Sequence, residues 1–82
     1  MIDSDSLTAL IRSGIPDADV DIVDRTGTMD HFNVTVRSRA FKGKTLIEQH
    51  RLVYDTLNAA LKDGRVHAVE LKTIISENVG SL

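Results

Sequence analysis

The chain has 82 residues, a net charge of −2 at neutral pH and 27% charged residues, and this length predicts a single domain, residues 1–82, with a modest core. The sequence contains no cysteine, which excludes disulfides and metal sites built from thiolates of this chain alone. No apolar run approaches the roughly 20 residues of a membrane span, and acidic residues stand where a secretory signal would be basic, so we expect a cytoplasmic protein without membrane contact.

The first predicted helix runs from Asp3 to Ser13 and places apolar residues on one face at the i, i+3 and i+4 spacing. Asp3 and Ser4 both suit the N-cap position. Gly14 and Pro16 end the helix, because proline lacks a backbone N–H and disfavours helical geometry before it.

Two short strands follow this helix. Residues 19–24 alternate acidic and apolar side chains, and from His31 the alternation resumes with Phe32 on the apolar face. A loop with a glycine, residues 25–30, joins the two segments. This pattern predicts an antiparallel hairpin.

The strongest helix signal covers Thr45 to Lys62. Thr45 and Glu48 match a capping box, and Gly64 suits the left-handed residue just past the helix end. The predicted apolar stripe consists of Leu46, Val53, Leu57, Ala60 and Leu61, widened by Ile47 and Tyr54.

A last strand is predicted from Val66 to Thr73. A strand–helix–strand connection joins parallel strands, so this strand should pair parallel to the second one. The expected fold is therefore α+β, in the order helix–strand–strand–helix–strand, with a three-stranded mixed sheet and both helices on one face.

The run Gly43-Lys44-Thr45 imitates the end of a phosphate-binding loop. The complete motif needs a glycine five residues before Gly43, where Ser38 stands instead. A turn leading into a capped helix therefore explains these residues better.

The three histidines are candidate ligands for a transition metal. His50 borders the apolar stripe, which favours a packing role. His31 lies at a loop–strand junction and His67 at the start of the last strand, and for both a structural role stays open. Two histidines cannot complete a tetrahedral zinc site, so a partner would have to supply the remaining ligands.

Basic residues gather around the loop that leads into the long helix. Such a loop at a helix N-terminus can contact phosphates, although a solvated positive face is the alternative. No nucleophile–base set is apparent, so we do not expect an enzyme. The basic residues are Arg37, Arg39, Lys42, Lys44 and Arg51.

The chain resembles the BolA-like family from about Ser6 to Thr73, in the branch that has a histidine in the hairpin loop. This resemblance implies a fold akin to the second type of KH domain. The matching residues are His31-Phe32, Phe41-x-Gly43, His50-Arg51-x-Val53-Tyr54, Val66-His67-Ala68 and Leu71-Lys72-Thr73.

The resemblance implies a non-enzymatic partner of monothiol glutaredoxins in iron–sulfur and iron homeostasis. In such a complex a bridging 2Fe–2S cluster is held by the glutaredoxin cysteine, a glutathione thiol and two residues of the BolA-like protein. Those residues would be His67 and His31 here, and this chain alone would not bind the cluster.

The resemblance also implies an alternative, a DNA-binding transcriptional regulator that uses the basic residues on its KH-like surface. Docking of glutaredoxin without a cluster is a third interpretation, and a weak homodimer stays open. The chain departs from the family at Gln49, where arginine is usual, and after Thr73, where the usual sequence of a further helix is missing.

Overall fold

The structure, a computed structural model, describes residues 3–24, 31–66 and 68–76. The predicted order of helices and strands is confirmed, with one 3₁₀ turn added after the second strand. The elements are α1 (Ser4–Gly14), β1 (Asp19–Asp24), β2 (His31–Ser38), the 3₁₀ turn η1 (Arg39–Phe41), α2 (Leu46–Lys62) and β3 (Ala68–Ile75).

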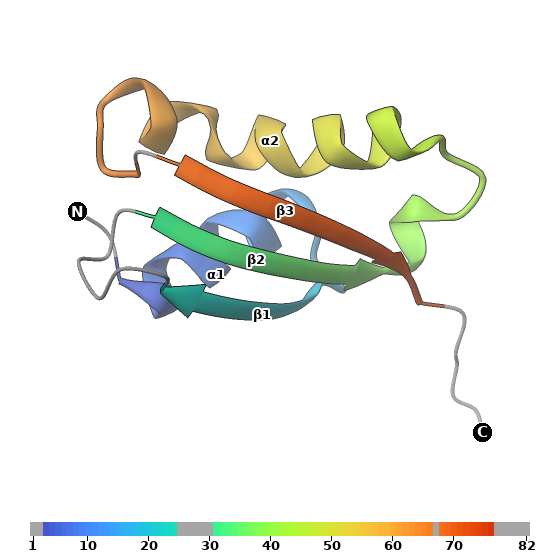
Figure 1. Cartoon of the computed structure of the whole chain (residues 1–82). Helices are drawn as coiled ribbons and strands as arrows, with labels where there is room; N and C mark the ends of the chain where they lie inside the picture. Colours follow the sequence, from blue (N-terminus) through green and yellow to red (C-terminus); the bar gives the residue numbers. More distant parts are fainter. Residues whose placement is uncertain (1–2, 25–30, 67, 77–82) are drawn as a thin grey trace.

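The three strands form one mixed sheet with β2 in the centre (Figure 1). β1 pairs antiparallel to β2, with Val20 opposite Val36. β3 pairs parallel to β2, with His31 opposite Ala68. The predicted antiparallel and parallel pairings are therefore both confirmed, whereas the predicted loop at residues 25–30 lies outside the described residues.

Both helices cover the same face of the sheet. In β2 the side chains of Phe32, Val34 and Val36 are buried, and they pack in one core with residues of α1 and α2 such as Leu7 and Leu57. Figure 1 shows α1 behind the sheet and α2 along β3. We call the other face of the sheet the open face; its residues are Asp19, Asp21, Val23, His31, Asn33, Thr35, Arg37, Ala68, Glu70, Lys72 and Ile74.

The ends of α1 explain how it packs against its neighbours. Asp3 caps the helix by accepting a hydrogen bond from the Ser6 N–H over 2.7 Å. At the other end, a Cβ placed on Gly14 would lie 2.6 Å from Cγ2 of Thr56 on α2. Glycine at this position therefore allows the close approach of the two helices.

The capping box of α2 is present as predicted. The Glu48 N–H donates to Oγ1 of Thr45 over 3.2 Å, and the Thr45 N–H donates to Oε1 of Glu48 over 2.9 Å. Gly64 follows the helix with a φ of 83°, which confirms its left-handed conformation.

Two boundaries differ from the predictions. Leu46 and Ile47 were predicted in the apolar stripe but are 62% and 70% exposed, because the buried face of α2 begins only at Gln49. The last strand begins at Ala68 and ends at Ile75, two residues later at each end than predicted. Val66 is buried before the strand, since its N–H donates to the Ala60 carbonyl of α2 and not to β2.

Among the described residues, no helix is both long enough and apolar enough to cross a membrane.

Candidate functional site

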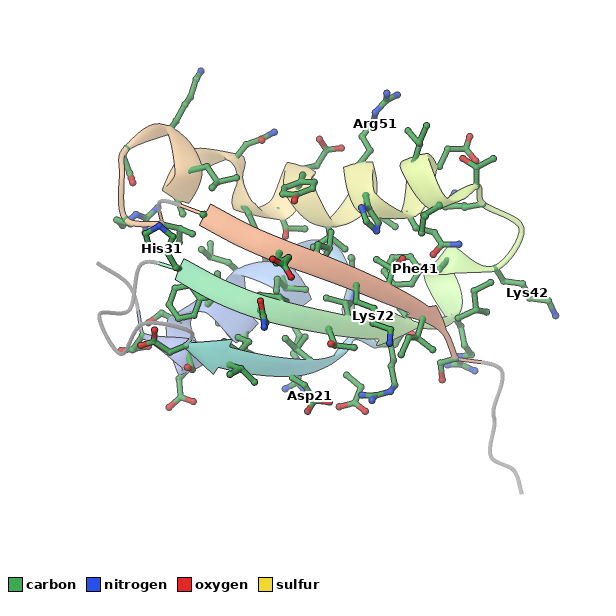
Figure 2. The ribbon with its side chains drawn as sticks, in the orientation of Figure 1. Asp21, His31, Phe41, Lys42, Arg51 and Lys72 are labelled. Carbon is green, nitrogen blue, oxygen red and sulfur yellow. The ribbon has the colours of Figure 1, made fainter. Side chains whose placement is uncertain are left out.

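The first candidate metal ligand, His31, is the first residue of β2 and lies exposed on the open face (Figure 2). Parallel pairing brings the beginning of β3 to the same end of the sheet, where Ala68 is the register partner of His31. The second candidate, His67, directly precedes Ala68 in the sequence and lies outside the described residues. The structure thus brings one predicted ligand beside the sequence neighbour of the other.

A shallow hollow of about 120 Å³ adjoins His31 between the starts of β2 and β3, and Val69 and Glu70 contribute to its wall. Glu70 lies on the open face opposite Asn33, and this is the next pair on that face after His31 and Ala68. Sequence reasoning missed this acidic neighbour, because only the strand register brings Glu70 near a residue almost forty positions earlier.

The side-chain oxygen Oδ1 of Asn33, on the open face of β2, is buried and accepts no hydrogen bond within the described part of the chain. Buried polar atoms in native proteins nearly always have a partner. Oδ1 of Asn33 is therefore an exception to this rule among the described residues.

No three side chains of histidine, aspartate or glutamate among the described residues lie close enough to hold a metal ion. The donor at this end of the sheet is an exposed imidazole, which suits iron or zinc as a ligand.

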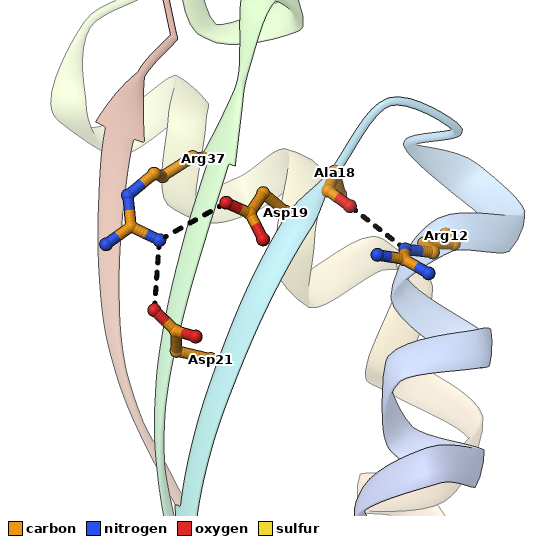
Figure 3. A network of polar contacts seen from close by, with 5 residues as sticks. All are labelled: Arg12, Ala18, Asp19, Asp21 and Arg37. Carbon is orange, nitrogen blue, oxygen red and sulfur yellow. Dashed lines mark hydrogen bonds and ion pairs between the residues drawn. The ribbon is translucent and has the colours of Figure 1, made fainter.

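The first of the five predicted basic residues, Arg37, is held by acidic side chains of β1 on the open face. Its Nη1 lies 2.9 Å from Oδ2 of Asp21 and 3.6 Å from Oδ2 of Asp19 (Figure 3). The hydrogen bond to Asp21 raises the pKa of the Arg37 guanidinium above its ordinary value. Much of the charge of Arg37 is therefore balanced within the molecule.

Asp17 similarly engages Arg39. The carboxylate of Asp17 accepts hydrogen bonds from the Ser38 hydroxyl over 2.6 Å and from the Arg39 N–H over 3.0 Å. These bonds, the one from Ser38 foremost, lower the pKa of Asp17, and the Arg39 Nε lies 3.8 Å from the same carboxylate. The ion pair is largely exposed and contributes little to stability, but it reduces the positive charge near η1.

The other three basic residues surround the beginning of α2. Figure 2 shows Lys42 at the loop tip and Arg51 on the outer side of α2, both pointing away from the sheet. Lys44 follows Gly43, whose φ of 79° makes the turn into the helix. The predicted basic set is thus divided, since Arg37 lies on the open face and these three do not.

The capping box already occupies the beginning of α2, where a phosphate would otherwise bind to backbone N–H groups. Glu48 places a carboxylate there, and its hydrogen bonds to Thr45 hold its pKa below the ordinary range. This finding agrees with a turn into a capped helix and leaves no anion cradle at Gly43-Lys44-Thr45.

Gln49 is buried on the core side of α2, although the sequence indicated it only as a departure from the family pattern. Its Nε2 donates to the Lys44 carbonyl over 3.0 Å, and its Oε1 accepts from the Thr73 hydroxyl over 2.6 Å. Gln49 therefore joins the basic loop to β3. Its position on the same helix face as Val53 and Leu57 is the signal that could have identified it.

Comparison with known proteins gives a consistent match. The sequence profile described as BolA-like protein matches residues 16–78. The uncharacterized protein RP812 of Rickettsia prowazekii is 30% identical over 73 residues, which cover 89% of this chain and 94% of that protein.

Two solved structures share the fold over nearly the whole chain. The BolA domain of SufE1 from Arabidopsis thaliana has a TM-score of 0.77 and 26% identity, covering 96% of this chain and 100% of that domain. A bol-like protein from Babesia bovis also has a TM-score of 0.77, with 25% identity, covering 92% of this chain and 86% of that one.

Proposed function

Because this chain belongs to the BolA-like family, we propose that it is a non-enzymatic partner of a monothiol glutaredoxin. In the complex it co-ligates a bridging 2Fe–2S cluster and acts in iron–sulfur and iron homeostasis. We place this function in the cytoplasm, where thiols such as glutathione remain reduced.

The observation that carries this proposal is the position of His31. It is exposed on the open face, at the end of the sheet where Ala68 follows His67 in the sequence. A neutral imidazole at this place can donate to a metal that approaches from outside the protein. The two histidines are the ligands that we assign to this chain.

The chain needs a partner for this chemistry, since iron–sulfur clusters are usually held by thiolates and the sequence has no cysteine. In our proposal the glutaredoxin cysteine and the glutathione thiol supply the sulfur ligands. The cluster would supply an iron site that accepts imidazole nitrogen, and His31, on the open face, and His67 would hold it from this chain.

The test is reconstitution with a monothiol glutaredoxin, glutathione, iron and sulfide under anaerobic conditions, followed by visible absorption and circular dichroism. We expect His67→Ala to abolish the spectrum of the bridged complex while the far-ultraviolet spectrum of the fold persists. His50→Ala is the matched control, because His50 lies on α2 and is half-buried. An unchanged cluster spectrum for His67→Ala would remove His67 from the ligand set.

DNA-binding regulation is the alternative function. Lys42, Lys44 and Arg51 around the beginning of α2 support it, since basic side chains in one region can contact phosphates. The ion pairs of Arg37 and the net charge of −2 argue against DNA binding. Proteins gain affinity for DNA when unpaired basic side chains neutralise phosphates and release the counterions of the DNA.

A further inference from the structure

The outer edge of β3, on the side away from β2, lies beside α2 (Figure 1). Within the described part of the chain β3 pairs with a strand on one side only. The Ser76 N–H donates to the Ser38 carbonyl of β2 over 3.2 Å. Counting back from Ser76, every second residue of β3 therefore also directs its backbone N–H and C=O groups toward β2. The residues between them direct their backbone groups away from β2. We define the outer edge by three of these residues, Leu71, Thr73 and Ile75.

A hydrogen bond from α2 supports this direction of the backbone. The Tyr54 hydroxyl donates to the Val69 carbonyl over 3.3 Å, and Val69 has the same parity as Leu71 and Thr73. Tyr54 bonds to the edge at Val69, whereas no described residue makes a hydrogen bond to the outward backbone groups of Leu71, Thr73 or Ile75. A binding segment would therefore be short and would run along the last residues of β3, at the same end of the molecule as the beginning of α2 (Figure 1).

Next to this edge, α2 carries a largely apolar hollow of about 480 Å³. Leu46 and Ile47, 62% and 70% exposed, are large apolar side chains that the fold leaves uncovered in its wall. The ring of Tyr54 lines the hollow while its hydroxyl reaches β3, so hollow and edge adjoin. We call this the α2 hollow; it is lined by Leu46, Ile47, His50, Arg51, Tyr54, Asp55 and Asn58.

The electrostatic character of this region is positive toward the beginning of α2. Lys44 and Arg51 both act on Glu48, where their charges help to lower its pKa. Lys42 adds a third cation at the loop tip, so three cations there outweigh one carboxylate. Asp55 adds a negative charge only two turns further along α2.

We propose that the outer edge of β3 binds an extended polypeptide segment by strand addition. Apolar side chains of the segment enter the α2 hollow over Ile47, and acidic side chains face Lys44 and Arg51. The outward N–H and C=O groups of β3 can pair with the backbone of an added segment. Every second side chain of that segment then faces the neighbouring surface of α2. This site is separate from His31 and requires no cluster.

The test uses a blocked hexapeptide of alternating valine and glutamate, titrated into the isotope-labelled full chain and followed by NMR. We expect the backbone amides of Leu71 and Thr73 to shift and to exchange more slowly with solvent. A hexapeptide of alternating valine and lysine is expected to bind more weakly, because its charge matches that of Lys44 and Arg51.

Two matched variants locate the site. Ile47→Asp should weaken binding at least about tenfold, as expected when an apolar side chain loses its burial. Val23→Asp, at an apolar residue 60% exposed on β1, should leave the affinity unchanged. Because Ile47 lies exposed in the first turn of α2, the acidic variant should fold; Leu46→Asp, at the neighbouring residue, provides a second measurement at the same site.

Several results would overturn the proposal. Equal affinity for the peptide in wild type, Ile47→Asp and Leu46→Asp would do so, as would amide changes on β1 and none on β3. A single-stranded oligonucleotide that shifts the Leu71 and Thr73 amides when the acidic peptide does not would assign the edge to nucleic acid instead. These measurements use the chain without iron, so they are independent of the proposed cluster.

Discussion

The Thr73 hydroxyl of β3 donates a hydrogen bond of 2.6 Å to Oε1 of Gln49, on the buried face of α2. The Nε2 of the same glutamine donates to the Lys44 carbonyl, so one amide satisfies two polar groups at once. A buried polar side chain is stable only when it is paired in this way. Gln49 thereby fixes the loop before α2 relative to the sheet.

We expect Gln49→Leu to lower the free energy of unfolding by about 1–3 kcal/mol, because it leaves the Thr73 hydroxyl and the Lys44 carbonyl without their partner. Urea unfolding followed by circular dichroism measures this loss. Asn58→Leu, at an exposed position of the same helix, should cost much less. Equal losses in the two variants would show that the link contributes nothing specific.

Thr45→Ala removes the side chain that caps α2, and we expect it to lower the free energy of unfolding by about 1 kcal/mol. Glu48→Gln keeps a side-chain oxygen that can accept from the Thr45 N–H, so it should cost less. Thermal unfolding of both variants tests this order. A larger loss for Glu48→Gln would mean that the charge at the helix N-terminus matters more than the hydrogen bonds.

Replacing His31 should alter the complex with glutaredoxin in a graded way. We expect His31→Ala to loosen the cluster and His31→Cys to retain it with a shifted absorption spectrum, because a thiolate then replaces an imidazole. The measurement is the visible spectrum of each mixture with glutaredoxin and glutathione. Superimposable spectra for wild type and both variants would make His31 a bystander.

Asp17 should confer pH-dependent stability. Hydrogen bonds from Ser38 and Arg39 hold its folded-state pKa below the unfolded value of about 3.9. The ionised carboxylate therefore stabilises the fold above that value, and its contribution is lost as pH falls through the lower folded-state pKa.

Urea unfolding near neutral pH should accordingly show Asp17→Asn less stable than wild type, with the difference shrinking as pH falls below the unfolded value of about 3.9. Asp5→Asn, on the exposed first turn of α1, is the control and should lower the free energy of unfolding less than Asp17→Asn does. A difference between Asp17→Asn and wild type that is constant over the whole pH range would contradict the prediction.

The two kinds of basic residue should differ in any affinity for DNA. We expect Lys42→Gln to weaken binding to a DNA duplex at low salt and to reduce the salt dependence, since a phosphate contact releases a counterion. Arg37→Gln should change neither, because Asp21 and Asp19 already balance that charge. Fluorescence anisotropy over a range of salt concentrations measures both effects.

Local patterns in the sequence predicted most of the fold. Alternation predicted the two paired strands, and the Thr45–Glu48 pair predicted the beginning of α2. Each of these signals is formed by residues only a few positions apart. The bounds of β3 were less accessible to prediction, since Val66 resembles a strand residue but donates its N–H to the helix end at Ala60. Boundaries of this kind depend on contacts that form only in the folded chain.

The candidate site was only partly predictable for the same reason. His31 could be selected by residue type and by resemblance, whereas the pairing of Arg37 with Asp21 joins residues sixteen positions apart through the strand register. The exposure of Ile47 was also missed, because a helical stripe shows which residues share a face but not where the core ends. His67 remains a prediction, since it lies outside the described residues.

The alternation along β2 also means that the hydrophobic core determines the direction of a ligand on the surface. Phe32 is buried, and its neighbour His31 therefore points to the opposite side of the sheet. A slip of one residue in the pairing would bury the imidazole and expose the phenyl ring, at the cost of an entire apolar face. A well-packed interior thus fixes the outward direction of residue 31, whether or not a partner uses the imidazole.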